Sequence, residues 1–136
     1  MNIISLVFDA YGGRGGIARY NVNLLKALSL NPKLNKIFVF AKNSYYKIDD
    51  LPKKVTFFCD GQKNYFSYIF DILKRKNQIY NVSFIICGHI NLLPIAKLLS
   101  KLFNAEIILI IYSLFSKVFE SKSLKPLGSF GLTFIS

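Results

Sequence analysis

The chain has 136 residues, 52% of them hydrophobic and 18% charged, and 18 Lys and Arg against 7 Asp and Glu give it a formal net charge of +11. This composition excludes an intrinsically disordered chain, and the length suits one domain with a real core. The charged fraction lies below the roughly 25% of an average soluble domain, which indicates either unusually extensive burial or an apolar surface that something else covers. The positive balance favours an anionic partner, although lysines scattered over solvated faces would give the same charge.

Short β-branched runs alternate along the chain with stretches of helical periodicity. We expect strands over 3–8, 37–41, 55–58, 82–87 and 107–111, with the start of a sixth at 132–136. We expect helices from Gly16 to about Ser29, over 65–76 and over 92–99, and weak helical character in 115–131. Because the strands are apolar on both faces, the pattern predicts an α/β fold in one domain, a Rossmann-like doubly wound parallel sheet with helices on both sides.

No segment of the sequence is typical of secretion or of membrane insertion. The N-terminal stretch has no basic start, and Asp9 interrupts its short apolar run. No stretch reaches the roughly 18 uncharged apolar residues of a membrane span. Cys59 and Cys87 lack CxxC spacing, so we expect neither a disulfide framework nor a metal site. These features predict a cytoplasmic protein.

A glycine-rich loop follows the first predicted strand and leads into the first predicted helix. It consists of Gly12, Gly13, Arg14, Gly15 and Gly16. Ligands of open α/β sheets bind beyond the carboxyl ends of the strands. Glycines let the backbone approach an anion closely, and a helix N-terminus favours negative charge. We therefore interpret the loop as a phosphate or carboxylate cradle, with a glycine-rich turn as the alternative.

The loop departs from two common nucleotide-binding motifs. Gly13, Gly15 and Ala18 satisfy the permissive G-x-G-x-x-A dinucleotide pattern, which expects an acidic residue about 20 positions later. The sequence there reads FAKN at 40–43, without an acid, so binding of NAD is disfavoured. The G-x-x-x-x-G-K-[ST] phosphate loop does not occur in the chain.

The single histidine, His89, follows the fourth predicted strand and is the candidate catalytic residue. Imidazole can donate, accept or titrate near neutral pH, and a ligand would meet it at a strand end. The alternative is a half-buried histidine that caps the next helix. Cys87 lies two residues earlier on the opposite strand alternation, so the sequence indicates no nucleophile.

The predicted helix over 65–76 combines an aromatic face with a basic end formed by Lys74, Arg75 and Lys76. Such a helix can lie on an anionic membrane surface, which makes these three residues candidates for membrane contact. The pattern favours an ordinary helix that covers the sheet and keeps its basic residues solvated. Aromatic residues fall on core periodicities rather than between basic residues, so we expect no nucleic acid partner.

Several stretches resemble the N-terminal domain of GT-B glycosyltransferases of family 4 (group 1). The strongest are the loop and helix GGRGGIARY at 12–20 and NLLKAL at 23–28, and the strand, histidine and helix in FIICGHINLLPIA at 84–96. The stretch 105–112 is similar to the strand before the family's H-G-x-E segment, where this chain reads YSLF. The stretch 132–136 resembles the start of the next strand of the family.

The resemblance implies a cleft between two Rossmann-like domains, with 1–136 as the acceptor-side part and without the donor-binding C-terminal domain. It implies that Gly13, Gly15 and Gly16 face the sugar diphosphate, that His89 lies by the reacting sugar, and that no metal is needed. The expected activity is transfer of a sugar from a nucleotide-sugar donor to a glycan or lipid-linked acceptor at the inner membrane face. The isolated chain, which holds no cofactor of its own, would be inactive.

A second hypothesis belongs to a different class. The chain would be a stand-alone binding module for a phosphorylated ligand, or one half of a split enzyme whose C-terminal domain is a separate chain. Both hypotheses depend on the glycine loop, which would bind the anion in either case.

Overall fold

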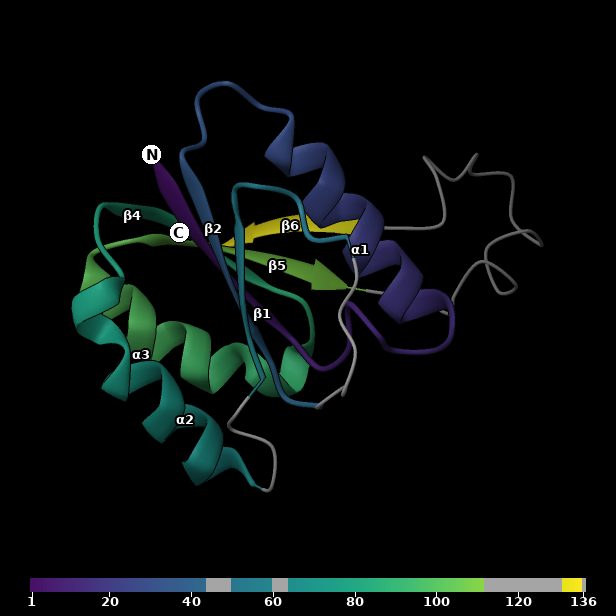
Figure 1. Ribbon diagram of the computed structural model, residues 1–136. Helices are drawn as coiled ribbons and strands as arrows, with labels where there is room; N and C mark the ends of the chain where they lie inside the picture. Colours follow the sequence, from purple (N-terminus) through teal and green to yellow (C-terminus); the bar gives the residue numbers. More distant parts are fainter. Residues whose placement is uncertain (44–49, 60–63, 112–130, 136) are drawn as a thin grey trace, which may run out of the picture.

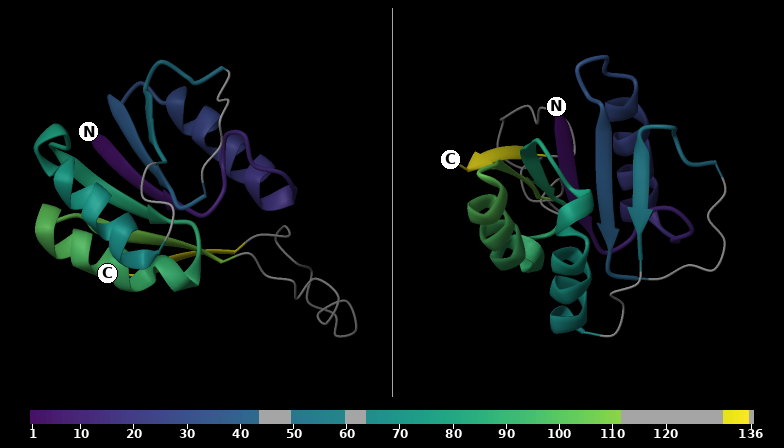
Figure 2. Two further views of the ribbon diagram at one scale, coloured as in Figure 1. Left: turned by 60° about the horizontal axis from the view of Figure 1, so that its bottom comes forward. Right: turned by 60° about the vertical axis from the view of Figure 1, so that its left-hand side comes forward.

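Three layers make up the computed structural model, which describes residues 1–43, 50–59, 64–111 and 131–135. A central sheet carries one helix on one face and two on the other (Figure 1, Figure 2). The strands are β1 (Asn2–Val7), β2 (Lys36–Ala41), β3 (Val55–Phe58), β4 (Val82–Cys87), β5 (Glu106–Ile111) and β6 (Gly131–Ile135). The helices are α1 (Gly16–Ser29), α2 (Tyr65–Lys74) and α3 (Leu93–Phe103), with short 3-10 turns η1 (Lys76–Gln78) and η2 (Ile90–Leu92).

The order of the strands in the sheet is β3-β2-β1-β4-β5-β6. The first five are parallel, which confirms the predicted Rossmann-like parallel sheet. After β1 the chain builds β2 and β3 on one side, and then crosses over to build β4 and β5 on the other. The order therefore reverses between β1 and β4, and in such sheets this is the place where ligands bind.

The sixth strand differs from the parallel pattern expected for it. It pairs antiparallel with β5, with Gly131 opposite Ile111 and Ile135 opposite Ile107. The residues of an edge strand suit either direction, because parallel and antiparallel ladders use the same backbone groups. The expected helical character of 115–131 falls on residues that lie almost wholly outside those described.

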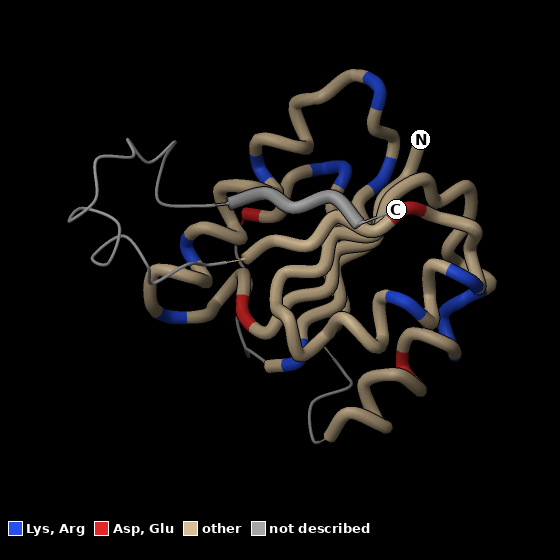
Figure 3. Tube along the Cα trace, turned by 180° about the vertical axis from the view of Figure 1, so that it is seen from behind, with Lys and Arg blue, Asp and Glu red and all other residues tan. Residues whose placement is uncertain are grey.

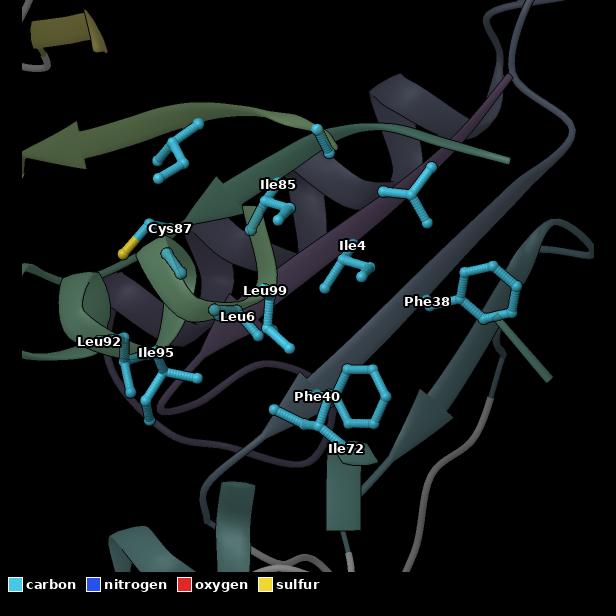
Figure 4. Close-up of a cluster of buried hydrophobic side chains, with 14 of the residues drawn as sticks. Ile4, Leu6, Phe38, Phe40, Ile72, Ile85, Cys87, Leu92, Ile95 and Leu99 are labelled. Atoms are coloured by element: carbon cyan, nitrogen blue, oxygen red, sulfur yellow. The ribbon is translucent and has the colours of Figure 1, made fainter. Parts of the chain in front are cut away.

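Successive side chains of each strand point to opposite faces of the sheet, so the core consists of two clusters, one on each face. Ile4 and Leu6 of β1 face α2 and α3, whereas Ile3 and Val7 face α1. Figure 4 shows the first cluster, in which side chains of β1, β2 and β4 meet Ile72 of α2 and residues of α3. Both faces of β1 are thus buried, as expected for a central parallel strand.

Local signals set the ends of the helices. Asn64 caps α2 by accepting a hydrogen bond from the Ser67 N–H at 2.8 Å. Pro94 lies in the first turn of α3, and Asn104 ends that helix in the left-handed conformation, at φ 50°. Three of the predicted helices are confirmed, with α2 ending at Lys74 and α3 continuing to Phe103.

The first strand starts one residue earlier than predicted, at Asn2. This buried side chain donates to the Tyr80 carbonyl at 2.6 Å and accepts from the Lys36 N–H at 3.1 Å. It thereby joins the starts of three neighbouring strands. Hydrophobic periodicity missed it because the side chain is polar, although a buried amide with satisfied hydrogen bonds is compatible with a core position.

Candidate functional site

The glycine loop and His89 lie at the same edge of the sheet, because β1 and β4 are neighbours. The Gly88 N–H donates to the Leu6 carbonyl at 2.8 Å and ties the end of β4 to that of β1. The rings of Phe8 and His89 meet edge to face, with centroids 4.8 Å apart. The tertiary structure therefore places at one edge of the sheet two features that lie more than seventy residues apart in the sequence.

Gly88 is required at the end of β4 by this close approach. A Cβ added at Gly88 would lie 2.9 Å from the Leu6 carbonyl oxygen and 3.1 Å from Cγ1 of Val7. Real Cβ atoms do not come so close to a backbone oxygen. The glycine before His89 is thus explained by packing against β1.

The glycine loop forms one wall of an open cavity of about 780 Å³, the glycine-loop cavity. All five loop residues that the sequence indicates line it. The other lining residues come from the end of β1, from α1 and from the stretch before β3: Ala10, Tyr11, Ala18, Arg19, Val22, Asn23, Lys26 and Asp50. The cavity has three cationic side chains against one carboxylate, so its lining favours an anion.

The backbone of the loop suits an anion as well. Gly12 and Gly15 have φ of 82° and 98°, values that residues with side chains rarely adopt. The Gly13 N–H donates a hydrogen bond to the Ala10 carbonyl at 3.0 Å and so closes a turn. Gly15, the N-cap residue before α1, provides no side-chain cap, and the first turn of the helix holds no acidic residue. The positive end of the helix dipole is therefore not neutralised by an acid of this turn.

Arg19 and Lys26 are cavity residues that the reasoning from the sequence missed. They lie seven positions apart with Asn23 between them, so they share one face of α1. This spacing of polar residues on the helix that follows a glycine loop is the signal that would have found them. Lys26 Nζ lies 3.8 Å from Asp50 Oδ2, an exposed ion pair that contributes little to stability.

Tyr11 lines the cavity, and its ring packs edge to face on Phe57. Its hydroxyl is buried and has no hydrogen-bond partner among the described residues. Burial first, and the nearby carboxylate of Asp50 second, raise the pKa of Tyr11 to about 12. The phenol therefore stays protonated near neutral pH and is unsuited to act as a base.

His89 acts as a cap in this structure. Its Nδ1 accepts a hydrogen bond from the Asn91 N–H at 3.1 Å at the start of η2, and the residue is half-buried. It does not line the glycine-loop cavity. The hydrogen bond requires an unprotonated Nδ1, so a neutral ring carries its proton on Nε2. The capping alternative is thus observed, and the catalytic role stays a prediction.

Cys87 is buried beneath His89. Its Sγ donates to the His89 carbonyl at 3.1 Å. Burial raises the pKa of the Cys87 thiol above its ordinary value, and the hydrogen bond opposes that shift. The group is therefore mainly a neutral thiol at neutral pH, which agrees with the absence of a predicted nucleophile.

A further cation, Lys42, lies at this edge after β2. Its Nζ lies 5.7 Å from the ring centroid of Phe8 and 5.2 Å from that of Tyr65. Lys42 occupies the stretch where a dinucleotide-binding fold has its ribose-binding acid. Lys42 could have been found from the sequence, because it directly follows the second predicted strand, where the dinucleotide-binding pattern expects an acidic residue.

The three basic residues at the end of α2 have two different environments. Lys74 and Lys76 are exposed. Arg75 is half-buried, its Nε lies 2.9 Å from Asp71 Oδ1, and its guanidinium lies 4.5 Å from the centroid of the Phe58 ring. Arg75 thus holds α2 against the end of β3, and only the two lysines are available to an external partner.

Comparisons of the chain with protein-family models, with curated proteins and with solved structures give no match. Among the residues described, no group of three or more His, Cys, Asp and Glu side chains could hold a metal ion. The helices found in the same ranges are all too short, or not apolar enough, to cross a lipid bilayer.

Proposed function

We propose that this chain is the acceptor-side, N-terminal part of a nucleotide-sugar-dependent glycosyltransferase of the GT-B type. The observation that carries the proposal is the glycine-loop cavity beside the point where the strand order reverses, with Arg14, Arg19 and Lys26 in its lining. The motifs at 12–28 and 84–96, which resemble those of GT-B enzymes, fall on the two strand ends that meet there.

Glycosyl transfer from a nucleotide sugar leaves a nucleoside diphosphate, so negative charge grows on the leaving group. Prearranged N–H groups and cations stabilise such charge most where water is excluded. The backbone of the glycine loop, Arg14 and Arg19 would supply this stabilisation in a closed cleft. A second domain would bind the rest of the donor and close the cavity.

His89 is proposed to orient the reacting sugar. With Nδ1 engaged by the Asn91 N–H, the neutral ring presents an Nε2–H donor that suits a sugar hydroxyl. The packing of Phe8 against the ring limits its rotation. This role needs no ionised histidine and no metal.

Binding of a diphosphate tests the anion site directly. Isothermal titration with inorganic pyrophosphate, uridine diphosphate and nucleotide sugars should show binding that Arg14→Ala/Arg19→Ala weakens about ten-fold or more, because charge-assisted hydrogen bonds are lost. Lys33→Ala/Lys53→Ala removes the same charge from exposed residues that do not line the cavity, and should change the affinity little.

Transfer itself needs the second domain. Radiolabelled nucleotide sugars incubated with glycan and lipid-linked acceptors should yield product only when a GT-B donor-binding domain is supplied with the chain. Robust turnover by the chain alone would contradict its assignment as the acceptor-side part. A His89→Ala variant that keeps diphosphate binding but loses transfer would support the orienting role.

A stand-alone module for a phosphorylated ligand is the second candidate. The cationic lining of the cavity favours it, since binding an anion needs no partner domain. Diphosphate binding without transfer under any of these conditions would select this candidate. We include a cytoplasmic location in both proposals, because Cys59 and Cys87 form no disulfide and suit a reducing compartment.

A further inference from the structure

Helix α2 is apolar on the face that it turns away from the sheet. Tyr68 and Ile72 pack into the core, where the Tyr68 hydroxyl donates to the Phe40 carbonyl at 2.7 Å. Phe66 and Phe70, about half a turn around the helix, are 84% and 69% exposed. A helix that is hydrophobic all round is normally covered on all sides, so the outer face of α2 calls for a partner.

Helix α3 lies on the same face of the sheet as α2 (Figure 1, Figure 2) and also carries exposed apolar side chains, Leu98 and Leu102. We define the α2/α3 surface by its exposed apolar side chains, Phe66, Phe70, Leu73, Leu98 and Leu102. A hollow of about 530 Å³ lies along the outer face of α2. Single exposed apolar residues are ordinary, whereas a cluster of large ones marks an interaction surface.

Positive charge accompanies this surface. Lys74 and Lys76 follow its apolar residues on α2, and Lys97 and Lys101 alternate with them on α3; all four are exposed. In Figure 3 several blue segments gather on the part of the chain that carries these two helices. The only acidic residue of α2 is Asp71, which is buried and paired with Arg75. Asp71 thus does not offset the charge of Lys74 and Lys76 at the surface of α2. On α3, Lys97 and Lys101 share a hollow with one exposed acid, Glu106 at the start of β5.

We propose that the α2/α3 surface docks onto an anionic lipid bilayer. Exposed phenylalanines and leucines would enter the boundary of headgroups and acyl chains, and the neighbouring lysines would contact lipid phosphates. Lysine is depleted at protein interfaces but common around apolar residues that lie on membranes, so the combination favours lipid over a protein partner. Helix α2 has 10 residues and would lie in the interface plane.

The proposal is independent of glycosyl transfer, because none of the residues that define the α2/α3 surface lines the glycine-loop cavity. The chain can therefore bind diphosphate without binding vesicles, and it can bind vesicles without binding diphosphate. The two experiments use different variants and different probes, so each outcome refers to one proposal only.

Co-sedimentation with vesicles tests the docking. The chain should bind phosphatidylcholine vesicles that contain about one-third phosphatidylglycerol, bind pure phosphatidylcholine much less, and dissociate as salt rises. Phe66→Ser/Phe70→Ser should weaken binding to the anionic vesicles by about ten-fold or more, through loss of apolar insertion. Lys74→Glu/Lys76→Glu should weaken it by a similar factor.

A matched control comes from the opposite face of the sheet. Leu30, which ends α1, is 82% exposed, so Leu30→Ser removes an apolar side chain as exposed as Phe66 and should leave vesicle binding unchanged. All the substituted residues are exposed, so circular dichroism should show the same melting curve as for the wild type.

Three results would overturn the proposal. The first is absence of binding to the anionic vesicles at low salt. The second is binding that survives in Phe66→Ser/Phe70→Ser. The third is self-association of the wild type in sedimentation velocity that this variant abolishes, without vesicle binding, which would assign the surface to a second copy of the chain.

Discussion

Replacing Gly15 by alanine tests the geometry on which the candidate anion site depends. Gly15 has φ 98° and ψ 174°, a conformation open almost only to glycine. Its neighbour Gly16 is the first residue of α1, and its φ does not fall in the range that side chains rarely adopt. An added Cβ meets nothing within 4 Å at either position. The two substitutions therefore add the same methyl group to open space and differ in backbone strain.

The magnitudes follow from that difference. Gly15→Ala should lower the free energy of unfolding by about 1–3 kcal/mol, the cost of holding a residue with a side chain in this conformation. Gly16→Ala should raise it by up to about 1 kcal/mol, because alanine favours the helix and restricts the unfolded chain. The two variants should thus differ by about 1–4 kcal/mol, which is at least a few degrees in Tm for a domain of this length.

Urea unfolding followed by circular dichroism measures both values, and the midpoint can be compared at constant slope. Equal stability of the two variants would refute the reasoning, because it would mean that Gly15 does not hold the conformation described. A Gly15→Ala protein that remains folded should also bind pyrophosphate more weakly than the wild type, since relaxation of the loop moves the N–H groups away from the anion.

Three further predictions concern other residues, and the first two use the same unfolding measurement. Gly88→Ala should cost about 1–3 kcal/mol of stability, because its Cβ would lie 2.9 Å from a carbonyl oxygen of β1. Tyr68→Phe should cost about 1–2 kcal/mol of stability, because it leaves the buried Phe40 carbonyl of β2 without this donor. Tyr11→Phe should be neutral or stabilising, because the Tyr11 hydroxyl is buried without a partner in the described part of the chain. Alkylation by iodoacetamide, read by mass spectrometry, should reach Cys87 later than the partly exposed Cys59 at neutral pH, and should quicken at Cys87 as the pH rises towards its elevated pKa.

Each of these predictions has a result that would contradict it. Wild-type stability of Gly88→Ala would mean that β4 does not approach β1 so closely. Equal losses for the two tyrosine variants would mean that the Tyr11 hydroxyl has a partner. Alkylation of Cys87 that does not depend on pH near neutrality would mean that its thiol is already ionised, contrary to the raised pKa.

The positions of the strands, of the first two helices and of the glycine loop were predictable from the sequence. The strands, α1 and α2 lie within one or two residues of their predicted ranges, because alternation and helical periodicity act between near neighbours. The glycine loop was found for the same reason, since its glycines lie between a strand and a helix that are both visible in the sequence. The start at Asn2 was missed because its hydrogen bonds reach strands far along the chain.

The tertiary structure decided which of these elements meet. Pairing of β1 with β4 brings His89 to the edge of the sheet from which the glycine loop starts. The antiparallel pairing of β6 could not be foreseen from its composition. Packing also divided the basic end of α2, because Asp71 and Phe58 engage Arg75 and leave Lys74 exposed.

The sequence by itself determined a basic, apolar-rich α/β chain with a glycine loop after its first strand. Only the tertiary structure decided which of the described apolar and basic side chains stay exposed, among them Phe66 and Phe70 on α2 and Arg14 and Arg19 at the glycine-loop cavity. The physical reason is that composition and periodicity are properties of near neighbours. Exposure depends on which distant residues cover a side chain, and that is decided by the packing of the whole sheet.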